Sequence, residues 1–142
     1  MARGPRRLIG RYVDSSVVIS AFDLLDARQS DDLISGEQPL FTSMLVYVEV
    51  IRNLARLESF SGSQSVEEEF ENLFARMSII EIDDLVWSRA ADVARASGVK
   101  SLDAVHLAAA SALGDSALEF ATFDRRLAVA ARNLGMVVVG QE

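Results

Sequence analysis

The clearest indication of the fold comes from the segment Arg11-Tyr12-Val13-Asp14-Ser15-Ser16-Val17-Val18-Ile19. Apolar residues lead to a carboxylate, two hydroxyl residues follow, and an apolar run resumes. This order predicts a buried strand that ends at Asp14, then a tight turn and a helix capped by Ser15 or Ser16. In open α/β sheets, ligands bind in the crevice at the carboxyl ends of the strands, where Asp14 would lie. The alternative is that Asp14 only caps the helix, and this stretch alone leaves both open.

Composition limits the class of protein. With 142 residues, half of them hydrophobic, we expect one globular domain over residues 11–142, preceded by a basic leader at residues 1–10. The absence of cysteine excludes disulfides and thiolate metal sites. No apolar run is long enough to cross a bilayer and no secretory signal is evident, so we expect a cytoplasmic protein. A net charge of −7 argues against a general nucleic-acid binder. It does not argue against an enzyme that binds phosphate locally through a metal ion.

Strand-like and helix-like patterns alternate along the chain. Predicted strands cover about residues 11–13, 39–42, 78–82, 118–123 and 136–139. Predicted helices cover about residues 16–36 (with a break before residue 30 as an option), 44–58, 66–76, 84–98, 101–114 and 125–133. This alternation predicts an α/β fold with a mostly parallel sheet that is covered by helices on both faces.

A second carboxylate, Glu49, lies inside the predicted helix 44–58. Projected at about 100° per residue, this helix has a narrow polar arc that contains Glu49. The rest of the arc is Arg52, Asn53 and Arg56, and the broad apolar face is Met44, Tyr47, Val48, Val50, Ile51, Leu54 and Leu57. A solvated ion pair between Glu49 and Arg52 is as well supported as a functional role.

Two more aspartates occupy comparable positions. Asp103 lies in the first turn of a helix that is apolar almost all round, which predicts that the helix is buried. A carboxylate at the start of a buried helix needs a partner, and a cation is the natural choice. Helix-dipole stabilisation is the alternative for Asp103. Asp124 repeats the order of strand, carboxylate and helix seen at Asp14. His106 fits a packed or hydrogen-bonded residue better than a ligand, and Trp87 fits the core or a dimer surface.

The four carboxylates can converge on one crevice, where they would raise each other's pKa unless a cation intervened. Oxygen donors, with no cysteine and a single histidine, favour Mg²⁺ or Mn²⁺ over zinc. Such an ion can generate hydroxide and clamp the phosphate oxygens of an in-line displacement. Ser15 and Thr122 are candidates to hydrogen-bond the acidic residues and hold them in place.

Four segments together resemble a known family: Tyr12-Val13-Asp14-Ser15-Ser16, the helix with Ser43 and Glu49, Leu102-Asp103-Ala104-Val105-His106-Leu107-Ala108, and Ala121-Thr122-Phe123-Asp124-Arg125-Arg126-Leu127. They resemble the motifs of PIN-domain ribonucleases, and more narrowly VapC-type toxins of bacterial type II toxin–antitoxin modules. The resemblance implies a Rossmann-like three-layer sandwich with a five-stranded sheet. It also implies Mg²⁺-dependent hydrolysis of RNA phosphodiester bonds, a cognate antitoxin and a homodimer.

Carried over by position, the resemblance implies a catalytic quartet of Asp14, Glu49, Asp103 and Asp124. Asp14 and Asp103 would be the main metal ligands, Asp124 the next, and Glu49 would act through water. The basic leader departs from the family, whose chains begin close to the first strand. A tail, a partner contact and an upstream start codon all stay open as explanations.

Arginines near the carboxylates are candidates for holding RNA. Arg52 and Arg56 share the polar arc of Glu49, and Arg125 and Arg126 directly follow Asp124. We expect them to contact phosphates on either side of the scissile bond. The alternative is that they are surface charges or antitoxin contacts. We also expect a basic antitoxin residue to enter among the carboxylates and displace the metal.

Two rival functions remain at this point. A receiver-like signalling domain also has acidic residues and Mg²⁺ at the carboxyl edge of a parallel sheet. It needs a lysine after the last strand, whereas Lys100 precedes a helix and only Gly140-Gln141-Glu142 follow the last strand. The other rival is a non-catalytic binding module whose carboxylates serve only as helix caps.

Overall fold

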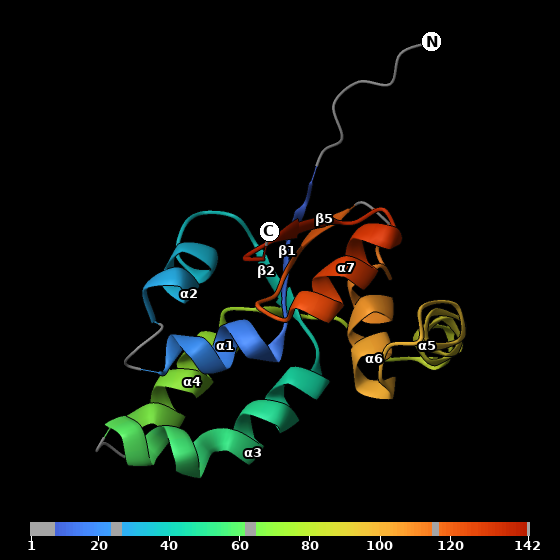
Figure 1. Ribbon diagram of the computed structural model, residues 1–142. Coiled ribbons are helices and arrows are strands. Elements are labelled where there is room, and N and C mark those ends of the chain that lie inside the picture. The colour runs from blue at the N-terminus through green and yellow to red at the C-terminus, as the bar shows by residue number, and fades with distance from the viewer. Residues whose placement is uncertain (1–7, 24–26, 62–64, 115–116, 142) are drawn as a thin grey trace.

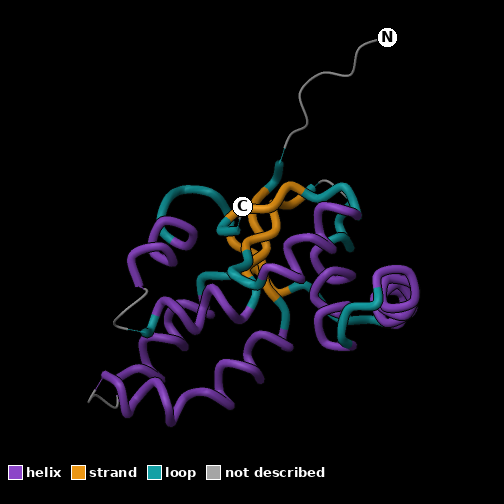
Figure 2. The backbone as a smooth tube through the Cα atoms, viewed as in Figure 1, coloured by secondary structure: helices purple, strands orange, loops and turns teal. Residues whose placement is uncertain are grey.

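The computed structural model describes residues 8–23, 27–61, 65–114 and 117–141. A five-stranded sheet lies at its centre (Figure 2). Every neighbouring pair of strands in it is parallel. The strands are β1 (Gly10–Val13), β2 (Leu40–Thr42), β3 (Ser78–Ile79), β4 (Leu118–Ala121) and β5 (Val137–Val139), in the order β3-β2-β1-β4-β5 across the sheet. The predicted parallel sheet of five strands is confirmed.

Helices cover both faces of this sheet (Figure 1). On one face lie α1 (Ser15–Ala21), α2 (Ala27–Ile34), α3 (Met44–Ser61) and α4 (Ser65–Ala75), and on the other lie α5 (Asp84–Ser97), α6 (Ser101–Ala110) and α7 (Arg125–Asn133). The predicted three-layer sandwich is therefore confirmed. Among the described residues, none of the helices combines the length and apolarity that crossing a bilayer would require.

Two hydrophobic cores follow from the alternation of side chains along the strands. Tyr12 of β1 and Phe120 of β4 lie in the core shared with α5, α6 and α7. Their neighbours Val13 and Ala121 point the other way, into the core shared with α1, α3 and α4. All four side chains are fully buried. Strands buried on both faces explain why their sequences are nearly continuous in apolar residues.

The pairing of β1 with β4 positions the first candidate carboxylate. Val13 lies opposite Ala121 in the parallel register, so Asp14 and Thr122 leave the sheet side by side. The amide of Asp14 donates to the carbonyl of Ala121 at 3.2 Å, which continues the ladder by one step. The sheet therefore fixes the backbone of Asp14 at the carboxyl ends of two central strands.

Two predicted strands are shorter in the structure than in the sequence pattern. The strand expected at residues 78–82 is only Ser78–Ile79, and the strand expected at 118–123 ends at Ala121. Strand length depends on the neighbouring strand as well as on the apolar run. Thr42, the last residue of β2, pairs with Ile79 before the chain turns into α3, so β3 has no further partner in β2.

Helix ends differ from the prediction at several places. The expected helix at residues 16–36 is two helices, α1 and α2. The expected helix at 101–114 already ends at Ala110, and α3 continues to Ser61. The predicted stop at Gly98 is confirmed, since this glycine ends α5 in the left-handed region with φ 70°. The predicted basic leader lies, for its first seven residues, outside the described part of the chain.

The predicted apolar face of α3 is only partly buried. Val46 and Val50 are fully buried, whereas Met44 is 50% and Val48 61% exposed. Helical projection shows which residues of a helix are apolar but not which ones a neighbouring element covers. Trp87 is 54% exposed, so it is not a core residue.

Candidate active site

Asp14 is buried immediately after β1, with 2% of its surface exposed. It is itself the N-cap of α1, so the prediction of Ser15 or Ser16 as the cap is wrong. Its Oδ1 accepts from the backbone N–H of Val17 at 3.2 Å and from Oγ of Ser16 at 2.6 Å. Burial raises the pKa of Asp14, and the hydrogen bonds from Ser16 and Thr122 partly offset this rise. The structure thus holds a carboxyl group where its charge is costly.

Thr122 connects Asp14 to Asp124. It is fully buried, it hydrogen-bonds Asp14, and its Oγ1 accepts from the backbone N–H of Asp124 at 3.0 Å. Ser16 contributes on the other side, because its Oγ accepts from the backbone N–H of Phe123 at 3.0 Å. Of the two predicted supporting residues, Thr122 lies at the aspartates, whereas Ser16 makes the contact expected of Ser15.

Asp124 is exposed and is the N-cap of α7. Its Oδ1 accepts from the backbone N–H of Leu127 at 3.0 Å. The capping alternative is therefore real for both strand-end aspartates. A cap uses one carboxylate oxygen, which leaves the other oxygen of Asp124 available to a ligand.

Asp103 is partly buried in the first turn of α6. The helix after it is buried from Ala104 to Ala110, as predicted. Burial is the main cause that raises the pKa of Asp103, and the negative charges of Asp124 and Glu49 raise it further. His106 and Lys100 act in the opposite direction. Asp103 therefore lies near enough to both Asp124 and Glu49 to be repelled by them.

Glu49 is held by a histidine and not by the predicted arginine. Its Oε1 lies 2.6 Å from Nε2 of His106, and its side chain is 28% exposed. Arg52 is exposed, and within the described residues it forms no ion pair with Glu49. The expectation of a packed, hydrogen-bonded His106 is confirmed, since this side chain is 2% exposed.

A chain of buried polar groups runs behind Glu49, and the sequence did not reveal it. The Oη of Tyr12 lies 2.9 Å from Nδ1 of His106 and 2.9 Å from Oγ of Ser43. An ionised Glu49 only accepts, so Nε2 of His106 carries a hydrogen and donates to it. In the neutral imidazole Nδ1 then accepts from the hydroxyl of Tyr12, which in turn accepts from Ser43. Burial raises the pKa of Tyr12 far above its ordinary value, so the phenol stays protonated.

The carboxylates share one neighbourhood without forming a closed metal cage. Within the described residues, no three acidic or histidine side chains are grouped tightly enough to hold an ion on their own. Their chemistry nevertheless fits Mg²⁺, which is commonly held by one or two carboxylates while water and substrate phosphates complete its shell. A cation would also relieve the cost of charging Asp14 and Asp103, whose pKa values are both raised.

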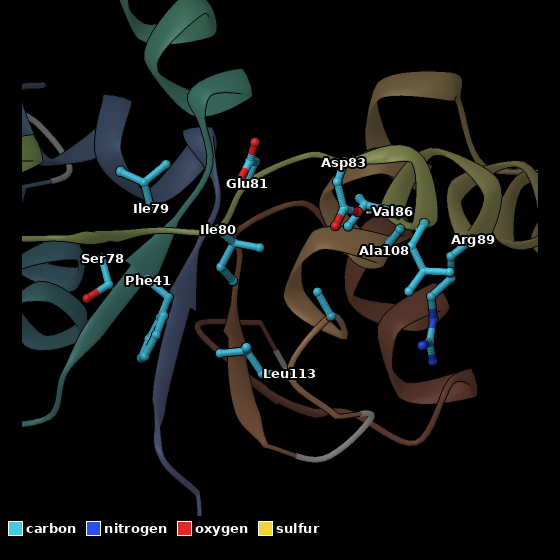
Figure 3. A pocket seen from close by; sticks show the side chains of 12 residues that line it. Phe41, Ser78, Ile79, Ile80, Glu81, Asp83, Val86, Arg89, Ala108 and Leu113 are labelled. Carbon is cyan, nitrogen blue, oxygen red and sulfur yellow. Dashed lines mark hydrogen bonds between the residues drawn. The ribbon is translucent and has the colours of Figure 1, made fainter.

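Two hollows lie at different places on the molecule. One, of about 870 Å³, contains Asp103 and Asp124 together with Arg125 and Arg126. The other, of about 390 Å³, lies between the β3 edge of the sheet, α5 and α6, and contains none of the four carboxylates (Figure 3). Its walls are mainly apolar: Phe41, Ile79, Ile80, Leu85, Val86, Ala108, Ala112 and Leu113. The first hollow is the one that adjoins the candidate site.

The predicted RNA-contacting arginines fall into two groups. Arg125 and Arg126 are exposed at the start of α7 and line the larger hollow beside Asp124. Arg52 and Arg56 are exposed on α3, and they are not among the described residues that line this hollow. The structure therefore brings only the first pair together with Asp103 and Asp124 in one cavity.

The chain has recognisable relatives. The family model for the PIN domain matches residues 11–133. The chain is 33% identical over 133 residues to "Ribonuclease VapC45" and "Ribonuclease VapC49" of Mycobacterium tuberculosis, and the match covers 87% of this chain and 90% of each relative. It is 28% identical over 131 residues to "Ribonuclease VapC46" of the same organism.

Solved structures share the fold at lower identity. PAE2754 from Pyrobaculum aerophilum superposes with a TM-score of 0.67 at 20% identity, covering 92% of this chain and 90% of that one. A chain of a toxin–antitoxin complex from Klebsiella pneumoniae gives 0.64 at 19% identity, covering 81% and 87%. FitAcB from Neisseria gonorrhoeae gives 0.64 at 18% identity, covering 89% and 94%. With the family model and the VapC relatives spanning most of its length, this chain belongs to the PIN domain family.

Proposed function

We propose that the protein is a Mg²⁺-dependent endoribonuclease that acts in the cytoplasm as the toxin of a toxin–antitoxin pair. The observation that carries this proposal is that Asp103 and Asp124 line one hollow, where the negative charges of Asp124 and Glu49 raise the pKa of Asp103. Such mutual repulsion is expected where a cation normally resides. Relatives named as VapC ribonucleases, matched over most of their length, support the choice of RNA as substrate.

Each acidic residue would have a distinct task. Asp14 and Asp103 would hold the metal, with Asp124 contributing from the start of α7; Mn²⁺ would serve in place of Mg²⁺. When bound, the ion would lower the pKa of water and neutralise phosphate charge. Glu49 is oriented through Oε1 by His106, which leaves Oε2 to accept a hydrogen bond from the attacking water. As the water oxygen bonds to phosphorus, Glu49 would take up the proton that the water loses, and the leaving ribose oxygen would take a proton from solvent as its bond to phosphorus breaks.

RNA would be guided by arginines on both sides of the carboxylates. Arg125 and Arg126 adjoin Asp124, and Arg52 and Arg56 continue along α3 from Glu49. In a protein with a net charge of −7, such local positive charge would position phosphates without attracting nucleic acid in general.

The proposed partners are an antitoxin and a second copy of the chain. The structural neighbour from Klebsiella pneumoniae belongs to a toxin–antitoxin complex, which supports a cognate antitoxin for this chain. The acidic cluster would accept a basic antitoxin side chain in place of the metal. Exposed apolar side chains, among them Met44, Val48 and Trp87, would lie in protein interfaces of the homodimer or the complex.

A non-catalytic binding module is the second candidate. It is favoured by the caps, because Asp14 and Asp124 both accept a backbone N–H at a helix start. The receiver-like alternative loses its support, since the chain belongs to the PIN domain family.

The decisive experiment compares two capping aspartates. Asp14→Asn keeps a carbonyl oxygen for the cap but removes the charge, so cleavage of a single-stranded RNA in Mg²⁺ should be lost. Asp83 caps α5 by accepting from the N–H of Val86 at 2.9 Å and lies outside the cluster, so Asp83→Asn should cleave like the wild type. EDTA should abolish cleavage by both the wild type and Asp83→Asn. Cleavage by Asp14→Asn at the wild-type rate would reduce the carboxylates to caps.

A further inference from the structure

The larger hollow has an unusual charge for this protein. It lies where the end of α5, the start of α6 and the start of α7 meet. Three cationic side chains line it, those of Lys100, Arg125 and Arg126, beside the two carboxylates of Asp103 and Asp124. In a chain with 21 acidic and 14 basic residues, cations are in excess here, at a place that adjoins the candidate active site.

Lys100 was not among the RNA-contact residues that the sequence predicted. It is exposed, and it is the N-cap of α6 without contributing a side-chain hydrogen bond to the cap. Its charge lowers the pKa of Asp103, so its ammonium group lies within electrostatic range of the cluster. Among the described residues, no ion pair or hydrogen bond occupies the side chains of Lys100, Arg125 or Arg126.

Two other described cations are already engaged. Arg11 pairs with Glu119 at 3.2 Å, and Arg132 donates to the backbone carbonyl of Gln141. The three cations in the hollow are available to a ligand, and they are grouped on the lining of one cavity. Grouped, unpaired cations on a predominantly acidic protein favour an anionic ligand.

We propose that the hollow formed by Lys100, Arg125, Arg126 and Asn133 binds an RNA backbone phosphate adjacent to the one that is cleaved. The proposal rests on the proposed ribonuclease function and specifies its substrate contacts. Asp103 and Asp124 line the same hollow as the three cations, so a strand bound at the two carboxylates would lie next to the cations. The volume of about 870 Å³ is within the usual range of ligand pockets and accommodates a nucleotide.

The lining also indicates that this subsite does not recognise the bases of the RNA. Its described apolar residues are alanine, valine and the glycine Gly98, with no aromatic side chain on which a base could stack. Phosphate contacts fix the position of a strand but carry no sequence information. The subsite should therefore bind RNA of different sequences with similar strength, and sequence preference must arise elsewhere.

The sequence offers a selective probe, because Lys100 is the only lysine. Reductive ¹³C-methylation would give one lysine signal by NMR, apart from the α-amine, and it preserves the positive charge. In EDTA, where no cleavage occurs, a short single-stranded oligouridylate should shift this signal. Oligoglutamate of equal charge should shift it much less.

The matched variants are Lys100→Gln and Arg95→Gln. Arg95 lies on exposed surface of α5 outside the hollow, so its loss changes net charge by the same amount. Lys100→Gln should weaken oligouridylate binding roughly tenfold, as expected for one charged hydrogen bond. It should also reduce the slope of log K against log salt by about 0.7. Arg95→Gln should leave both close to wild type.

The outcomes separate this inference from the ribonuclease proposal. If the wild type binds and cleaves RNA but Lys100→Gln binds equally well and the Lys100 signal does not move, the subsite is wrong and the enzyme proposal stands. An equal shift with oligoglutamate would overturn the assignment to RNA and favour an acidic protein segment. If the wild type neither binds nor cleaves RNA, the proposed function fails and the subsite fails with it.

Discussion

Replacing Tyr12 by phenylalanine should reveal how much the buried polar chain behind Glu49 stabilises the fold. The substitution keeps the ring, which stacks on Phe120 with centroids 5.6 Å apart and an interplanar angle of 6°. It removes only the hydroxyl that lies 2.9 Å from both Ser43 and His106. Because Tyr12, Ser43 and His106 are all buried, water cannot replace the lost contacts.

The expected cost follows from these two contacts. Leaving buried polar groups unsatisfied costs about 1–3 kcal/mol, so Tyr12→Phe should lower the free energy of unfolding by about 2 kcal/mol. For a domain of this size, that corresponds to a fall in Tm of roughly 6 °C. Equilibrium urea unfolding in EDTA measures the change without interference from metal. An unchanged m-value would show that stability alone has changed.

Tyr47→Phe is the matched control. Its hydroxyl donates to Glu71 at 2.6 Å, but this contact is exposed to solvent. Removing it should cost less than about 1 kcal/mol. If Tyr12→Phe and Tyr47→Phe unfold at the same urea concentration, the polar chain does not contribute as described. NMR of the single histidine supplies a second check, since the neutral ring should carry its hydrogen on Nε2.

The remaining predictions concern the charged groups. The pKa of Asp14 is raised by burial, so between the ordinary and the raised pKa the folded state binds more protons than the unfolded state. In urea unfolding of the metal-free wild type, the free energy of unfolding should therefore gain a contribution from Asp14 as the pH falls through the raised pKa. Asp14→Asn should lack this contribution. Equal pH dependence of the wild type and Asp14→Asn would refute the prediction. Asp103→Asn should be at least as stable as the wild type without metal in thermal melts, because it removes a repelling charge, and a clear loss of stability would contradict the repulsion. Arg52→Ala combined with Arg56→Ala should reduce the slope of log K for RNA binding against log salt by about 1.4, while the affinity for metal is unchanged. An unchanged slope would show that the polar face of α3 is an ordinary solvated surface. Removing the basic residues of the cognate antitoxin should weaken its binding, as calorimetry would show, and equal affinity would exclude a basic residue among the carboxylates.

Much of the fold could be predicted because its determinants are local. An apolar run followed by Asp14 marked the end of β1, Asp124 marked the start of α7, and Gly98 marked the end of α5. The five parallel strands followed from alternation with helices. The lengths of β3 and β4 could not be predicted in the same way, because strand length depends on pairing with neighbours that are distant in sequence.

The candidate site was predictable in its residues but not in its contacts. Glu49 and His106 are 57 positions apart, so nothing local indicated that they would form a 2.6 Å contact in preference to the pair of Glu49 with Arg52. A tyrosine two positions before Asp14 looked like an ordinary strand residue, yet its hydroxyl completes the polar chain. The grouping of Lys100 with Arg125 depends on how α5, α6 and α7 meet, which only the tertiary structure defines.

Titrating Mn²⁺ and following the EPR signal of the free ion would show whether these carboxylates bind a divalent metal. The wild type and Asp83→Asn should deplete free Mn²⁺, whereas Asp14→Asn and Asp103→Asn should leave most of it in solution. Depletion by Asp14→Asn and Asp103→Asn equal to that of the wild type would contradict the metal site.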